Sequence, residues 1–142
     1  MPDQLYQKAI MARAREATGA GTLAEADAHV TVDNPVCGDR VTLELRMEDG
    51  HVAAVAHTVR GCLLCEAAAS VIGANAPGAT RAEIEAARAA VTAMVESGAE
   101  IPADSWSDLA IFRPVAGHRS RHNCVLLPFE ALQRALDEAS AA

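Results

Sequence analysis

An alternating stretch at residues 40–60 constrains the fold of this chain more than any other feature of its sequence. Over residues 40–48, apolar and polar side chains alternate, which indicates a strand with one buried face. Asp49-Gly50 follows directly, and this dipeptide is a strong signal for a two-residue hairpin turn. Residues 51–60 then form a returning strand. We expect one face of that strand to carry Val52, Ala54 and Ala56, and the other face Val55 and Val59.

The residues before this hairpin add a strand and a helix to the prediction. Residues 28–32 are rich in β-branched side chains and end at the turn signal Asn34-Pro35. Residues 5–18 have the apolar spacing of an amphipathic helix, which Gly19 and Gly21 end. The residues of this helix expected to face inward are Leu5, Ile10, Met11 and Ala14. We therefore expect one helix followed by a three-stranded antiparallel sheet.

Helical patterns follow the sheet. Residues 62–76 are small and apolar, and they end just before the breaker Pro77-Gly78. Thr80-Arg81-Ala82-Glu83 has the pattern of a capping box, in which the threonine and glutamate side chains satisfy backbone N–H groups at the start of a helix. This second helix is expected to end near Ser97, because Gly98 follows it.

The last third of the chain is less regular. Residues 99–117 are predicted to be a loop with one helical turn at residues 108–111. Residues 120–139 have a helical pattern, but Pro128 lies among them, so the helix is expected to begin at that proline or to kink there. Strands followed by helices predict an α+β fold, in which several C-terminal helices pack on one face of the sheet. The length suits a single domain, residues 1–142.

Composition and charge exclude several classes of protein. The formal net charge is −7 and Lys8 is the only lysine, whereas nucleic-acid binding needs clustered Lys and Arg. The N-terminus lacks the features of a secretory signal, and no apolar stretch reaches the roughly 20 residues that span a bilayer. We therefore expect a cytoplasmic protein with no membrane or nucleic-acid partner. In that compartment, grouped cysteines indicate a metal site or catalysis more often than disulfides.

The chain has four cysteines, and the predicted topology brings at least two of them together. Cys37 follows the first strand and Cys62 follows the third, so in a three-stranded meander both lie at one end of the sheet, with Asp39 beside Cys37. Cys62 and Cys65 form a C-x-x-C pair at a helix start, where the helix dipole stabilises thiolates. Cys124 reaches this group if the last helix packs across the sheet.

Each of these residues also has a structural interpretation. A buried cysteine such as Cys124 is often simply a small apolar residue, and Asp39 beside a glycine is a common turn residue. His118 and His122 lie close to Cys124 in sequence and are either ligands, proton shuttles or solvated side chains. Two of the remaining three histidines, His51 and His57, lie on the predicted sheet and are interpreted as structural.

Three separated motifs resemble the U-type iron–sulfur cluster assembly proteins, whose members include IscU, SufU and the N-terminal domain of NifU. The motifs are Asn34-Pro35-Val36-Cys37-Gly38-Asp39, then Gly61-Cys62 followed by Ala67-Ala68-Ala69-Ser70, then Arg121-His122-Asn123-Cys124. The resemblance extends from the first helix to Leu136. It is closer to SufU than to IscU, because the interval from Cys62 to Cys124 is long and the Leu-Pro-Pro-Val-Lys motif of IscU is absent.

The resemblance implies a site built from Cys37, Asp39, Cys62 and Cys124. In SufU-type proteins this site holds zinc and accepts persulfide sulfur from a cysteine desulfurase, with Cys124 as the expected sulfur acceptor. In IscU-type proteins it binds iron and assembles a [2Fe–2S] cluster. The implied partners are a cysteine desulfurase and recipient apo-proteins or cluster carriers, and the implied state is a monomer or weak homodimer. Three thiolates suit zinc or iron–sulfur chemistry, and one carboxylate makes the fourth bond more exchangeable.

Cys65 departs from the family pattern, because the family more often has serine there. It is interpreted as an alternative sulfur acceptor, as a replacement ligand, or as a spectator, and His122 is a second alternate ligand. Two other functions stay open at this point. One is a purely structural zinc site in an interaction domain, and the other is a thiol enzyme that uses Cys62 and Cys65 as a redox pair.

Overall fold

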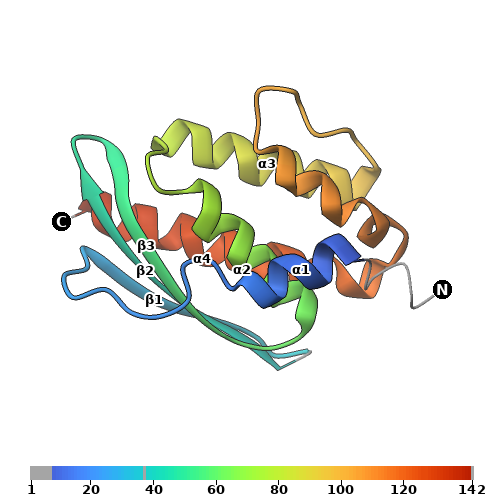
Figure 1. The fold of residues 1–142 in the computed structure, drawn as a ribbon, viewed down its shortest axis with the longest axis horizontal. Coiled ribbons are helices and arrows are strands. Elements are labelled where there is room, and N and C mark those ends of the chain that lie inside the picture. The colour runs from blue at the N-terminus through green and yellow to red at the C-terminus, as the bar shows by residue number, and fades with distance from the viewer. Residues whose placement is uncertain (1–7, 37, 142) are drawn as a thin grey trace.

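A three-stranded antiparallel meander forms one side of the molecule in the computed structural model, which describes residues 8–36 and 38–141 (Figure 1). The strands are β1 (Ala28–Asn34), β2 (Asp39–Glu48) and β3 (His51–Arg60). Asp49 and Gly50 both have positive φ, 52° and 79°, as the tightest hairpin turns require. The predicted hairpin and the third strand are confirmed, and the end of β1 pairs with the start of β2 at Asn34 and Asp39.

A β-bulge in the hairpin changes which residues of β3 face the core. Met47 pairs with Val52 and Arg46 pairs with Ala54, so Ala53 is an extra residue on β3. The bulge places Val52 on the buried face. Three further residues of β3 lie on that face, because each pairs with a buried residue of β2. They are Val55, His57 and Val59, which pair with Leu45, Leu43 and Val41 respectively. The prediction that Val52 shares a face with Ala54 and Ala56 is therefore wrong, because strict alternation cannot allow for an inserted residue.

Helices cover one face of this sheet in two layers. The helices next to the sheet are α2 (Leu63–Asn75), which lies against β3, and α4 (His122–Ala141), which lies against β1 and β2. Figure 1 shows α1 (Lys8–Glu16) and α3 (Arg81–Ser97) farther from the strands, where α1 packs on α2 and α3 packs on α4. Within the described residues, none of the helices is long and apolar enough to cross a membrane.

The first helix agrees with its prediction in part. Ile10 and Ala14 are buried and Met11 is half-buried, as expected for an inward face. Leu5 lies outside the described residues. The helix ends at Glu16, two residues earlier than predicted, and Ala17 follows it with φ of 47°.

The segment after α1 crosses α2 at very short range. A Cβ on Gly73 would lie 1.8 Å from the carbonyl oxygen of Thr18. The N–H of Thr18 donates to Ser70 Oγ at 3.1 Å, and Nε2 of His57 donates to the Thr18 carbonyl at 2.8 Å. Burial lowers the pKa of His57, and the bond to Thr18 opposes that shift. His57 is thus a core residue that holds this segment against β3, in agreement with its structural interpretation.

The predicted loop at residues 99–117 contains more helix than expected. Residues 99–106 have no helix or strand, but η2 (Ser107–Gly117) is a long 3₁₀ segment. Its buried residues, Leu109, Phe112 and Val115, recur every third position. That spacing matches three residues per turn rather than 3.6, so the prediction of a single turn at residues 108–111 was too short.

The last helix begins before Pro128, contrary to one of the two predicted outcomes. A short 3₁₀ turn, η3 (Arg119–Arg121), leads into α4, which begins at His122 and continues through Pro128. Because proline has no N–H, the carbonyl of Cys124 receives no helical hydrogen bond from that position. Since α4 begins at His122, Cys124 lies in its first turn, and its side chain is buried in the core.

Candidate metal centre

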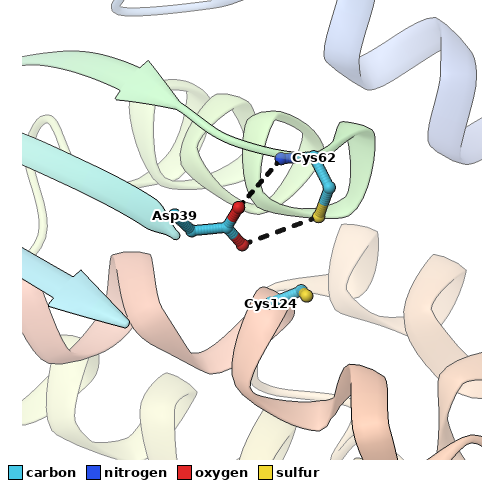
Figure 2. Close-up of side chains that lie close together, drawn as sticks. All are labelled: Asp39, Cys62 and Cys124. Carbon is cyan, nitrogen blue, oxygen red and sulfur yellow. Dashed lines mark hydrogen bonds between the residues drawn. The ribbon is translucent and has the colours of Figure 1, made fainter. Parts of the chain in front are cut away.

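Three predicted site residues from three parts of the chain converge at one end of the sheet. Asp39 is the first residue of β2, Cys62 follows β3 and precedes α2, and Cys124 lies in the first turn of α4 (Figure 2). One carboxylate oxygen and the two sulfur atoms all lie within 4.8 Å of one another. Cys37, the fourth predicted residue, lies outside the described residues.

Asp39 is held in place by Cys62. Its Oδ1 accepts the backbone N–H of Cys62 at 3.2 Å, and its Oδ2 accepts the thiol of the same residue at 3.7 Å (Figure 2). The residue is only 4% exposed. A buried carboxylate needs such donors, because water is no longer available to solvate it. Asp39 is therefore an oriented donor beside a thiol, and the interpretation of Asp39 as an ordinary turn residue is not needed.

Cys62 is the N-cap residue of α2, but its thiol takes no part in the capping and can serve as a metal ligand. Its carbonyl accepts the N–H of Glu66 at 3.1 Å, whereas its side chain makes no capping hydrogen bond. The side chain is half-buried and directed toward Asp39 and Cys124 (Figure 2). Cys62 also lines an open hollow on the surface, so the site is reached from this side.

Cys124 is nearly inaccessible, at 1% exposed. Burial, together with the neighbouring Cys62 and Asp39, raises the pKa of its thiol to about 12, while a hydrogen bond from the Arg121 side chain opposes the shift. With only these groups around it, the thiol is protonated at neutral pH. A cation bound among the three donors would reverse this balance and favour the thiolate.

The three donors fit a tetrahedral metal ion. Zinc–sulfur bonds of about 2.3 Å and zinc–oxygen bonds of about 2.0–2.2 Å place ligand atoms of a tetrahedral site about 3.6–3.8 Å apart. The observed separations, up to 4.8 Å, require a closure of about 1 Å, which side-chain rotation supplies. Two sulfurs and one carboxylate are also donors that zinc and iron accept.

The motifs carrying this geometry match a known family. The model of the NifU-like N terminal domain matches residues 5–125, which is most of the chain and includes all three donors. The chain belongs to this family. The predicted membership of the U-type assembly proteins is thereby confirmed.

Individual relatives of this NifU-like domain agree with the family match. The iron–sulfur cluster assembly scaffold protein IscU of Thermotoga maritima is 26% identical over 136 residues, covering 96% of this chain and 95% of the relative. A nitrogen-fixing NifU-like protein (N-terminal) from Brucella abortus has a crystal structure with a TM-score of 0.93 and 36% identity, covering 99% and 97% of the two chains. A putative iron–sulfur cluster assembly scaffold protein for the SUF system from Fervidobacterium islandicum AW-1 shares the fold. Its crystal structure has a TM-score of 0.88 and 24% identity, covering 96% of this chain and 99% of that protein.

The other candidate ligands of the NifU-like domain lie outside the donor group. Cys65 is fully buried in α2 and is not among the three clustered donors. Nε2 of His122 lies 3.2 Å from the carbonyl oxygen of Ala116, and the backbone N–H of His118 donates to Val115. The roles of Cys65 and His122 as alternate ligands stay predictions.

Two residues of the centre were not singled out from the sequence. Arg121 bonds Cys124 through its side chain, and it lies three positions earlier, about one helical turn away. Gly61 lies against Asp39, where a Cβ would be 2.5 Å from Oδ1. Both residues are in the family motifs, so their position next to a cysteine is the signal that could have identified them.

Proposed function

We propose that this NifU-like domain is an iron–sulfur cluster assembly protein that binds zinc at Cys37, Asp39, Cys62 and Cys124 and accepts persulfide sulfur from a cysteine desulfurase. The observation that supports it best is the convergence of Asp39, Cys62 and Cys124 within 4.8 Å. Cys37 is proposed as the fourth donor because it is two residues before Asp39 in the sequence.

The mixed donor set favours a carrier over a closed structural site. Zinc bound by four thiolates forms a stable and inert centre. Asp39 offers an oxygen instead, which is a harder donor and bonds this metal more weakly than a thiolate does. Bound zinc would supply positive charge that keeps the thiols ionised. Asp39 would then be the ligand that most readily gives up its place when sulfur is delivered.

Sulfur transfer to this protein needs no external oxidant. The Cys124 thiolate attacks the outer sulfur of the persulfide on the desulfurase, and a new sulfur–sulfur bond forms on Cys124. The original sulfur–sulfur bond breaks, and its electron pair leaves with the desulfurase cysteine as a thiolate. Because Cys124 is 1% exposed, this step requires the donor to enter from the more open side at Cys62 and displace Asp39.

Assembly of a [2Fe–2S] cluster at the same residues is the second candidate function. It is favoured by the Thermotoga maritima relative, which is an iron–sulfur cluster assembly scaffold protein and matches over nearly its full length. The cluster would then be cargo that the protein passes on to recipient apo-proteins or cluster carriers. Thiolates are the usual ligands of such clusters.

Anaerobic purification followed by metal and sulfide analysis separates these functions. About one zinc per chain without sulfide supports the sulfur carrier. Iron with labile sulfide supports the scaffold. A protein with neither, which also fails to take up zinc or iron on reconstitution, contradicts both.

The variant Asp39→Cys then tests the carrier against a purely structural zinc site. We expect it to retain zinc more tightly and to lose stimulation of the desulfurase, because a fourth thiolate closes the site. Arg46→Ala, at the far end of the same strand, is the matched control and should behave as wild type. Undiminished stimulation by Asp39→Cys would contradict the role given to the carboxylate.

A further inference from the structure

Two arginines lie directly opposite each other at the opening of the metal centre. Arg40 on β2 pairs in register with Arg60 on β3, next to Asp39 and just before Gly61-Cys62. Val41 and Val59 occupy the buried face, so the two arginines project from the opposite face of the sheet, where both are exposed. Like charges in directly opposed strand positions destabilise a sheet. The pair therefore costs stability unless negative charge offsets it.

Only one of the two charges is neutralised within the protein. Nε of Arg40 lies 2.7 Å from Oδ1 of Asp33, which forms an ion pair with it. Within residues 8–36 and 38–141, no carboxylate forms an ion pair with Arg60. Two carboxylates also line the opening, but Asp33 is bonded to Arg40 and Asp39 is bonded to Cys62. Among the described residues, Arg60 is therefore the arginine of this pair whose guanidinium has no carboxylate partner.

The arginines border an open hollow that leads to the donors. It has a volume of about 620 Å³ and is lined by Asp33, Gly38, Asp39, Arg40, Arg60, Gly61 and Cys62. An anionic group bound by the arginines would therefore lie next to Cys62. On the adjoining turn, the side chain of Val36 is 92% exposed. Among the described residues, no other large apolar side chain is exposed. An apolar anchor beside a charged rim is the usual composition of a protein–protein contact.

We propose that Arg40 and Arg60 form a docking point for an acidic side chain of the sulfur donor, the cysteine desulfurase. This inference rests on the proposed function, because it assumes that a donor protein visits the site. Charge complementarity selects the partner group, because the unpaired guanidinium of Arg60, with Arg40 opposite it, attracts a carboxylate. The pair steers the donor to the Cys62 side of the centre, while Val36 supplies apolar contact. Charges at the rim of an interface act mainly on the rate of association.

Association kinetics with the cysteine desulfurase of the same organism test this docking point. Arg60→Glu should lower the association rate constant about tenfold at low ionic strength. The difference should shrink at about 0.5 M salt, where charges are screened within roughly 4 Å. Arg46→Glu is the control. Arg46 is an exposed arginine on the same face of the sheet, and it lies six residues, or about 20 Å, along β2 from Arg40.

Asp33→Asn gives a test of opposite sign. It removes the carboxylate that neutralises Arg40, so the association rate constant should rise above that of wild type by about twofold or more. A variant that merely damaged the turn would slow association instead. This variant therefore keeps the inference testable even if Arg60→Glu perturbs the fold.

The outcomes separate the docking point from the proposed function. If wild type binds and stimulates the desulfurase but Arg60→Glu and Arg46→Glu associate equally fast, the docking point is wrong and the function stands. If Asp33→Asn slows association, the docking point is likewise overturned. If wild type neither binds nor stimulates the desulfurase, the proposed function fails and the docking point fails with it.

Discussion

Gly61 lies so close to Asp39 that a Cβ at position 61 would be 2.5 Å from the carboxylate Oδ1 and 2.8 Å from Cγ. Glycine at this position leaves room for the carboxylate to reach the N–H of Cys62. The backbone at the end of β3 thus helps to orient a ligand on β2. The metal centre depends on this residue although it offers no donor atom.

The variant Gly61→Ala should weaken the centre without removing a ligand. The new methyl group would displace the Asp39 side chain, since that side chain yields more easily than the backbone, and would break its bond to Cys62. Groups that orient metal ligands typically change metal affinity by about 10- to 100-fold when altered. Competition with a zinc chelator measures this loss. Gly117→Ala, where a Cβ would meet no atom within 4 Å, is the control. Equal zinc affinity in both variants would show that Asp39 does not need this space.

Zinc binding should release a proton from Cys124. Because burial and the neighbouring Cys62 and Asp39 raise the pKa of this thiol to about 12, it is protonated in the metal-free protein at neutral pH and must ionise to bind. Zinc affinity should therefore rise with pH. Calorimetry in buffers of different ionisation enthalpy counts the protons released, and Cys124→Ser should release fewer than wild type. The same count in both proteins would exclude Cys124 as a thiolate ligand.

The raised pKa of Cys124 also affects the metal-free protein in alkali. The folded state keeps this proton up to about pH 12, whereas an unfolded thiol loses it near pH 9.0. Between these values the folded state binds more protons, so the free energy of unfolding falls as pH rises. Chemical denaturation of the metal-free protein at pH 8 and pH 10 measures this fall, and Cys124→Ser should reduce it. A fall of the same size in the variant would assign it to other groups.

Gly73→Ala should destabilise the whole fold. A Cβ there would lie 1.8 Å from the carbonyl oxygen of Thr18, a backbone atom that cannot rotate away. Overpacking of this kind costs about 1–3 kcal/mol or more. Denaturant unfolding measures the loss, with Gly117→Ala again as control. A free energy of unfolding equal to that of wild type would mean that the segment after α1 is not held against α2 in solution.

The elements that the sequence predicted well depend on neighbouring residues. The hairpin follows from alternation and from Asp49-Gly50, which are local properties. The bulge at Ala53 was missed, because an inserted alanine leaves an apolar pattern that still looks alternating. The long 3₁₀ segment was missed although its buried residues recur every third position, because such segments are seldom that long.

The candidate site was predictable to different degrees for its members. Asp39 and Cys62 follow from the meander, which places the start of β2 beside the end of β3. Cys124 depends on how α4 packs across the sheet, a long-range arrangement that the family resemblance suggested and local patterns do not determine. The contacts of Gly61 and Arg121 do not follow from local sequence, because each acts through the position of another side chain.

Locating the persulfide is the most direct test of sulfur acceptance at this centre. The zinc-loaded protein is incubated with the desulfurase and cysteine, its thiols and persulfides are alkylated, and its peptides are analysed by mass spectrometry. We predict one additional sulfur atom on the peptide that contains Cys124, and none in Cys124→Ser or when cysteine is omitted. Extra sulfur on Cys62 or Cys65 alone, or on no cysteine of the chain, would contradict the account.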